Sequence, residues 1–134
     1  MAAAKPVRRY DEDKLQASIV AEYRRQFDCL VFSVPNGGNR NPREAAKLKW
    51  TGVLAGVPDL IALGRDGRAL FIECKTQKGK ESPAQVAIMD DLWDRGFTVH
   101  TVRDLDSALA VGRAFGLEPK RTAPRSAVAL QTGF

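Results

Sequence analysis

The pattern of apolar and polar positions divides the chain into short apolar runs and longer amphipathic stretches. Two apolar runs, residues 60–63 and 69–74, flank a turn-forming stretch at residues 64–67, which predicts a β-hairpin. Both runs are apolar at nearly every position, a pattern typical of central strands covered on both faces. Apolar runs at residues 29–34 and 97–102 predict two further strands, of which the first is also apolar enough to be central.

Helical spacing is clearest before the first strand. Apolar residues at intervals of four from Leu15 to Tyr23 mark the inner face of a helix over about residues 12–26, with Asp11 as its expected cap. A dense run of turn formers follows the first strand, and residues 42–49 then predict a short helix with basic side chains exposed.

The third and fourth helices are predicted from their caps. Ser82 and Pro83, with Gln85 three residues after the serine, form a helix start with a capping box, and Gly96 ends this helix. Asp104 is expected to cap the last helix. The expected buried stripe of the third helix is Val86, Met89, Leu92 and Trp93.

These elements predict an α/β fold in which helices flank both faces of a mixed β-sheet of about four strands. The length of 134 residues indicates a single domain. We expect residues 1–10 to form a flexible basic arm, residues 11–116 the folded domain, and residues 117–134, which lack clear periodicity, a mobile tail.

Composition narrows the classes of protein. No apolar run is long enough to span a membrane, and the first residues lack the apolar core of a secretory signal. Cys29 and Cys74 lie in apolar runs and are expected to be reduced core residues. We therefore expect an intracellular protein. The net charge of +5 favours a polyanionic partner, although only weakly.

Three charged residues stand at one end of the predicted hairpin, where burial makes charge costly. A two-residue loop would place Asp59 opposite Cys74, whereas a three-residue loop places it opposite Glu73. The longer loop suits Gly67, because it needs a glycine in the left-handed region. Lys75 shares a face with Glu73, since strand side chains repeat every second residue. We therefore expect Asp59, Glu73 and Lys75 to converge.

Two adjacent carboxylates repel unless a proton or a cation lies between them. An oxygen-only pair suits a hard divalent ion, Mg²⁺ or Mn²⁺, with water completing the shell. A neighbouring lysine can orient or deprotonate water, or neutralise charge on a phosphate, so this set of groups can hydrolyse phosphodiesters. The simpler interpretation is a salt bridge of Lys75 with Glu73 or Asp59. The combination of Pro-Asp, hairpin and Glu-x-Lys favours the metal site.

Pro58-Asp59 and Glu73-Cys74-Lys75 match the signature of the PD-(D/E)xK nucleases. With their flanking residues and the stretch from Ser82 to Gln85, they resemble the VRR-NUC branch of that superfamily, over roughly residues 11–109. The resemblance implies a restriction-endonuclease-like fold. It also implies a metal held by Asp59, Glu73, the Cys74 backbone carbonyl and a glutamate of the first helix, with Lys75 acting on the water.

Two assignments stay open. The first-helix glutamate is taken to be Glu12, with Glu22 as the fallback, although Glu12 is equally explained as part of an acidic first turn. Gln85 is explained either by the capping box or, through the resemblance, by a place beside Lys75 in the active site.

The resemblance further implies a DNA endonuclease selective for branched DNA such as a Holliday junction, acting in DNA repair as a homodimer. The alternative is a non-catalytic nucleic-acid-binding module on the same fold. The predicted DNA contacts are Arg40, Arg43, Lys47, Lys49 and Lys78.

Overall fold

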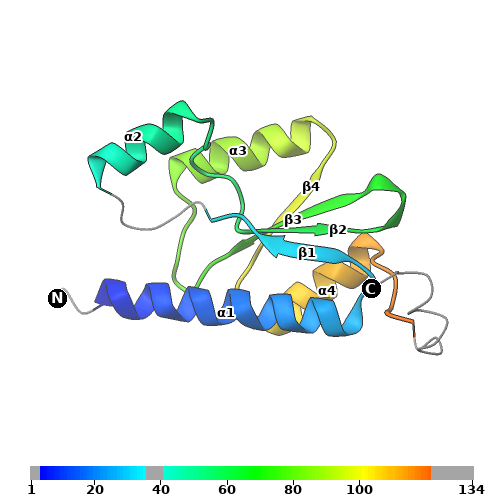
Figure 1. Cartoon of the computed structure of the whole chain (residues 1–134). Helices are drawn as coiled ribbons and strands as arrows, with labels where there is room; N and C mark the ends of the chain where they lie inside the picture. Colours follow the sequence, from blue (N-terminus) through cyan, green and yellow to red (C-terminus); the bar gives the residue numbers. More distant parts are fainter. Residues whose placement is uncertain (1–3, 36–40, 122–134) are drawn as a thin grey trace, which may run out of the picture.

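The computed structural model describes residues 4–35 and 41–121, with side chains from Asp11 onward (Figure 1). Four strands form one sheet in the order β1-β2-β3-β4. The strands are β1 (Leu30–Ser33), β2 (Leu60–Leu63), β3 (Ala69–Cys74) and β4 (Thr98–Val102). β2 pairs antiparallel with both β1 and β3, whereas β4 runs parallel to β3. The predicted mixed sheet is therefore confirmed.

Helices cover both faces of the sheet, as the pattern predicted. In Figure 1, α1 and α4 lie on one side, α3 lies on the other, and α2 lies beyond the first turn of α3. The helices are α1 (Ala4–Gln26), α2 (Pro42–Trp50), α3 (Pro83–Asp94) and α4 (Leu105–Phe115). Asp104 caps α4 as expected, because its Oδ1 accepts the Ser107 amide at 2.7 Å. Within the described residues no helix is long and apolar enough to cross a membrane.

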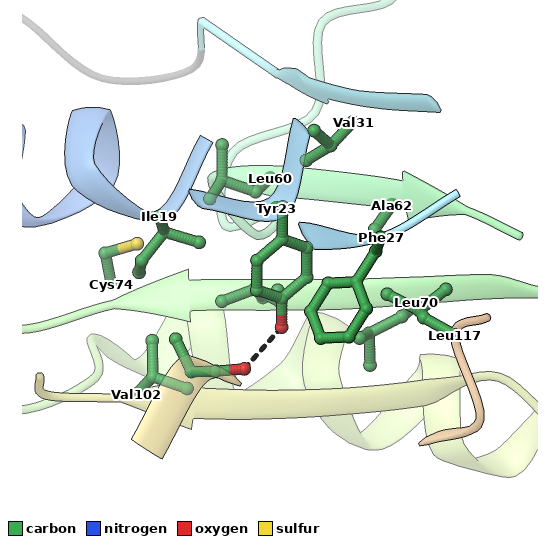
Figure 2. Close-up of a cluster of buried hydrophobic side chains, with 12 residues drawn as sticks. Ile19, Tyr23, Phe27, Val31, Leu60, Ala62, Leu70, Cys74, Val102 and Leu117 are labelled. Atoms are coloured by element: carbon green, nitrogen blue, oxygen red, sulfur yellow. Dashed lines mark hydrogen bonds between the residues drawn. The ribbon is translucent and has the colours of Figure 1, made fainter. Parts of the chain in front are cut away.

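The main core lies between the sheet and the layer of α1 and α4 (Figure 2). Ile19, Tyr23 and Phe27 project from α1 and its end onto the buried faces of the strands, as their spacing predicted. Tyr23 donates a hydrogen bond to the Ala108 carbonyl of α4, and its ring meets Phe27 edge-on at 5.0 Å between centroids. Cys74 lies in this core, and both cysteines are free thiols.

The hairpin between β2 and β3 closes with the longer of the two loops considered. Residues Arg65–Gly67 form the three-residue loop, and the Gly64 amide donates to the Arg68 carbonyl at 2.9 Å. Gly67 has a φ of +73°, in the left-handed region that the loop was expected to require. Asp66 also lies there, with a φ of +65°, which the sequence did not predict.

Expectations about the two ends of the domain need correction. Backbone helix begins at Ala4, so residues 4–10 continue α1 instead of forming a loose arm, and Asp11 lies inside the helix instead of capping it. At the other end Leu117 is buried, and residues 118–120 bond to the end of α1 through Asp28 N to Glu118 O at 2.7 Å and Lys120 N to Gln26 O at 2.8 Å. The predicted mobile tail therefore does not begin at 117, and its remainder from 122 lies outside the described residues.

Two expectations about burial are also wrong. β1 is an edge strand instead of a central one. Its apolar residues are covered on one face only, so Leu30 is 64% exposed. The stripe of α3 is half-covered: Val86 and Trp93 are 45% and 49% exposed, and α3 contains no buried residue. The pattern of apolar residues predicts which face of a helix or strand is covered. How completely that face is covered depends on the neighbouring helices and strands.

Candidate active site

The hairpin register sets the two acidic residues opposite each other. β2 and β3 pair Leu60 with Ile72, and the same register continued by one residue sets Asp59 opposite Glu73. Asp59 is held at the start of β2 because its Oδ2 accepts the Cys74 amide at 2.9 Å. Cys74 thus contributes its N–H to the site while its thiol packs in the core.

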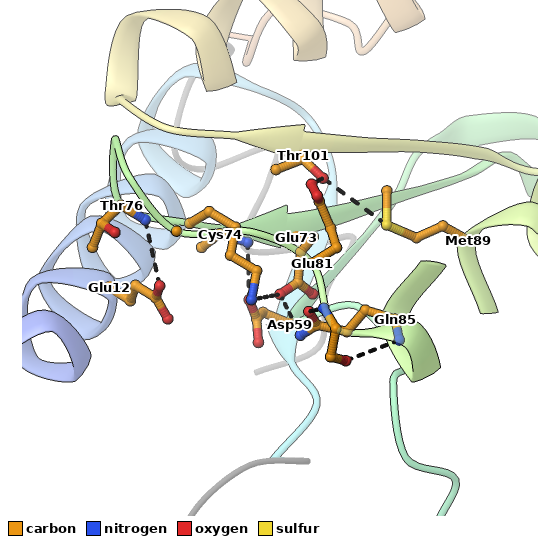
Figure 3. Close-up of polar contacts among 12 residues, drawn as sticks. Glu12, Asp59, Glu73, Cys74, Thr76, Glu81, Gln85, Met89 and Thr101 are labelled. Carbon is orange, nitrogen blue, oxygen red and sulfur yellow. Dashed lines mark hydrogen bonds and ion pairs between the residues drawn. The ribbon is translucent and has the colours of Figure 1, made fainter. Parts of the chain in front are cut away.

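Among the residues whose side chains are described, Glu73 is the one charged residue that is buried, with only 2% of its surface exposed. Its Oε2 accepts a hydrogen bond from Gln85 Nε2 at 2.9 Å and lies 3.5 Å from Lys75 Nζ (Figure 3). Its Oε1 is buried and has no hydrogen-bond partner among the described residues. The salt bridge of the simpler interpretation is therefore present, but it uses only one of the two oxygens. An unpartnered buried oxygen is costly and suits a ligand.

The two carboxyls shift each other's titration. Burial, then the charge of Asp59, raises the pKa of Glu73 to about 7, and Lys75 opposes the shift. Burial also raises the pKa of Asp59, whereas the Cys74 amide, Lys75 and the Glu73 side chain favour its charged form. Because both charges are disfavoured, a cation placed between the groups would relieve both.

Gln85 forms the predicted capping box and also reaches the acidic pair, where it contacts Glu73. Its Oε1 accepts the Ser82 amide at 2.8 Å and its backbone amide donates to Ser82 Oγ at 3.2 Å, which completes the capping box of α3. The other end of the same side-chain amide donates to Glu73. The cap thereby fixes the orientation of the group that holds Glu73.

The two glutamates of α1 differ in how near they lie to the acidic pair. Glu12 Oε2 lies 3.4 Å from the Thr76 amide, just beyond β3, and its charge contributes to raising the pKa of Asp59. Glu22 instead pairs with Arg25 at 2.7 Å and with Gln26. Glu12 is therefore the α1 glutamate near the site.

The donor set fits a divalent ion as a carboxylate pair. Within the part of the chain whose side chains are described, no three His, Cys, Asp or Glu residues are grouped to hold a metal. Mg²⁺ is commonly bound by one or two carboxylates, with waters and substrate phosphates as the other ligands. Asp59 and the unpartnered Oε1 of Glu73 meet that requirement.

The predicted DNA contacts lie on exposed surface where they are described. Arg43, Lys47 and Lys49 are exposed on α2, and Lys78 is exposed in the loop after β3. Arg40 lies outside the described residues.

Residues that the sequence did not single out organise the loop at 76–81. Arg103 Nη1 donates to the carbonyls of Thr76 and Gly79, both at 2.6 Å, and its Nη2 lies 3.9 Å from Glu81. Thr101, which pairs with Glu73 across β3 and β4, donates to Glu81 at 3.2 Å. No local motif points to these contacts, because they depend on how the end of β4 lies against the loop after β3.

The sheet order, with its acidic pair at the hairpin end, defines a restriction-endonuclease-like α/β protein. The model of the VRR-NUC domain matches residues 7–104, so the chain belongs to the VRR-NUC domain family, a nuclease family.

Solved structures agree with this membership. A VRR-NUC domain protein shares 27% identity and a TM-score of 0.64, with 81% of this chain and 90% of that chain covered. A second VRR-NUC domain, 19% identical with a TM-score of 0.57, covers 77% of this chain and 95% of that one, and supports the fold. None of the curated proteins compared with the chain matches it.

Proposed function

We propose that the chain is a DNA endonuclease that hydrolyses phosphodiester bonds with Mg²⁺ or Mn²⁺. One observation carries the proposal: Glu73 is buried with an unpartnered Oε1, opposite Asp59, and the pKa values of both carboxyls are raised. A salt bridge with Lys75 alone would leave the Oε1 of Glu73 without a partner, since the ion pair uses Oε2. Membership in a nuclease family supports the same chemistry.

Asp59 and Glu73 would hold the metal, with the Cys74 carbonyl as a further ligand and Glu12 acting directly or through water. When bound, the ion supplies a more acidic water and neutralises charge that develops on the phosphate. Gln85 orients Glu73 by holding Oε2, which leaves Oε1 for the ion. Lys75, only 12% exposed and beside Glu73, would position or deprotonate the water and stabilise the negative charge on phosphorus.

The proposed substrate is branched DNA, such as a Holliday junction, in DNA repair. A small domain without a separate recognition module is better suited to DNA shape than to a long sequence. Cutting two strands symmetrically requires two active sites, hence a two-fold homodimer. Arg43, Lys47, Lys49 and Lys78, with Arg40, are proposed to contact the DNA backbone. The protein would act where DNA is found, in the cytoplasm or nucleoid of a bacterium or of a phage-infected cell.

The test is cleavage of a labelled panel of duplex, flap, single-stranded and four-way DNA with Mg²⁺ and with Mn²⁺. Asp59→Asn is the sharper variant, since an asparagine can still accept the Cys74 amide while losing the charge. We expect Asp59→Asn and Lys75→Ala each to lower the cleavage rate by at least about 100-fold. Asp66→Asn, which removes an exposed carboxylate at the other end of the same hairpin, should cleave normally.

Thermal melting tests metal binding separately from DNA cleavage. Mn²⁺ should raise the Tm of the wild type and of Asp66→Asn but not that of Asp59→Asn. Full metal-dependent cleavage by both site variants would end the proposal. Binding of branched DNA without cleavage under either metal would favour the non-catalytic module.

A further inference from the structure

The exposed tryptophan at the end of α2 has no role in the fold. Trp50 is 86% exposed, and no residue of α2 is buried. The helix begins with its own cap, since Asn41 Oδ1 accepts the Glu44 amide at 2.8 Å. Val53 and Leu54, which follow Trp50 in sequence, are also exposed, and a group of exposed apolar side chains, unlike a single one, suggests a contact with another molecule.

Trp50 shares its helical face with cations. Arg43, Lys47 and Trp50 are spaced by four and three residues, which places them along one side of α2, and all three are exposed. Lys49 is exposed on an adjoining face. Cations that can follow a phosphate backbone, ending at an aromatic ring, are the combination that binds single-stranded nucleic acid.

The segment after Trp50 leads directly to the candidate active site. Gly56 lies against the first turn of α3, so closely that an added Cβ would fall 2.4 Å from the Ala84 carbonyl oxygen. The next residue of α3, Gln85, holds Glu73. Gly56 follows Trp50 by six residues, so along the chain the Trp50 end of α2 is the end nearer to this contact with α3. A strand bound along α2 would therefore enter the site from the Trp50 end.

We propose that Trp50 is a stacking platform for an unpaired base of the DNA strand that enters the active site, with Arg43 and Lys47 on its backbone phosphates. This rests on the proposed function, because it takes DNA as the substrate. Bases inside a duplex are already stacked and present no face to Trp50. The platform therefore selects DNA with unpaired nucleotides beside the cleavage point, as at a flap or an open junction.

A second copy of the chain is the competing occupant, because Val53 and Leu54, 41% and 57% exposed, extend the apolar surface. Lysines are depleted from the cores of protein interfaces, whereas Lys47 lies one turn from Trp50 and Lys49 is adjacent to it. The charges therefore favour a nucleic acid.

The chain has two tryptophans, which allows each to be followed alone. Trp93→Phe leaves Trp50 as the sole emitter, and Trp50→Phe leaves Trp93, which packs edge-on against His100 in α3 and β4. Both are titrated in EDTA with oligothymidylate, a duplex carrying a single-stranded flap, and a blunt duplex. We expect oligothymidylate and the flap to quench Trp50 emission, the blunt duplex to leave it unchanged, and Trp93 to respond to none.

Affinity gives the second measurement. Trp50→Ala should weaken binding of oligothymidylate and the flap duplex by about 10-fold, since stacking on an aromatic ring contributes strongly per base. Blunt-duplex binding should change less than about twofold, and Trp93→Ala should bind all three normally. Unchanged melting of Trp50→Ala, whose side chain is exposed, shows that the fold is intact.

Equal quenching by blunt duplex, or no quenching by any DNA, would overturn the platform. So would a Trp50→Ala variant that sediments at a lower mass than the wild type and binds flap DNA normally, which would assign the surface to a protein interface. These readouts need no metal. A wild type that shows the expected quenching but cleaves nothing with Mg²⁺ or Mn²⁺ would refute the proposed function while supporting the platform.

Discussion

Glu73 presents two oxygens in different environments. One is held by Gln85 and lies near Lys75, and the other is buried without a partner among the described residues. Burying a charged carboxylate this way is unfavourable, and the nearby charge of Asp59 adds to the cost. The metal-free protein should therefore be most stable when Glu73 is protonated.

This asymmetry predicts a dependence of stability on pH. The pKa of Glu73 is about 7 in the folded chain, against 4.5 as the ordinary value, so the folded state binds more protons between these pH values. Stability without metal should therefore fall as pH rises from about 4.5 to about 7, by up to about 3 kcal/mol. The raised pKa of Asp59 acts in the same direction. Urea unfolding in EDTA across this range measures the change.

Glu73→Gln isolates the contribution of this residue. Its neutral amide can still accept from Gln85, so we expect a variant more stable than the wild type at pH 8 and a much flatter profile. Glu44→Gln, which removes an exposed carboxylate from α2, should keep the wild-type profile. A Glu73→Gln profile as steep as that of the wild type would show that other groups cause the dependence.

Gln85 shows what a sequence pattern can and cannot decide about one residue. The Ser-x-x-Gln spacing correctly predicted the capping box, because that contact is local. The hydrogen bond to Glu73 joins residues 12 apart in sequence and depends on where α3 begins relative to β3. The two explanations were treated as alternatives, yet one side-chain amide has an oxygen for one contact and a nitrogen for the other.

At the scale of elements, the start of α3 is positioned by the segment that joins α2 to β2. Gly56 combines a φ of +94° with close contact to the Ala84 carbonyl. Gly52 in the same segment has a φ of +106°, but a Cβ there would meet no atom within 4 Å. Both glycines therefore need a left-handed backbone, but only at Gly56 would an added Cβ collide with neighbouring atoms.

This pair predicts how the site depends on helix placement. Gly52→Ala should lower the free energy of unfolding by about 1 kcal/mol, the cost of the left-handed backbone. Gly56→Ala should cost at least about 2 kcal/mol more, because the methyl group displaces the first turn of α3. Since that turn carries Gln85, cleavage should also fall in Gly56→Ala alone, by about 10- to 100-fold. Urea unfolding and cleavage of flap DNA measure both; equal losses in the two variants would contradict the explanation.

Local sequence signals predicted the caps of α3 and α4. They also predicted the hairpin and its loop, and with the loop the meeting of Asp59, Glu73 and Lys75. They failed for the edge position of β1, because strand order depends on contacts between distant segments. They failed for Arg103 for the same reason, since its two carbonyl partners lie more than 20 residues away in sequence.

At the scale of the whole molecule, the folded unit extends past the region matched by the family model. That match ends at residue 104, just before α4. α4 supplies the carbonyl that accepts from Tyr23, and Gly112 lies so close to α1 that an added Cβ would fall 2.8 Å from Phe27. Leu117, 6% exposed, completes the core beyond α4. The site therefore rests on a sheet whose other face is closed by residues 105–117.

A chain cut after Asp104 should consequently fail to fold, although it retains every candidate site residue. Loss of residues 105–117 uncovers Tyr23, Phe27 and the core face of the sheet. The lost burial should exceed the free energy of unfolding of a typical domain. Leu117→Ala tests the same contact mildly and should cost about 2–5 kcal/mol while the fold survives, whereas Leu30→Ala, at a 64% exposed position, should stay within about 0.5 kcal/mol. Circular dichroism melts measure all three. A cooperative melt of the truncated chain would show that the sheet and α1 are stable without α4, and that residues 105–117 are an addition to the nuclease domain instead of part of it.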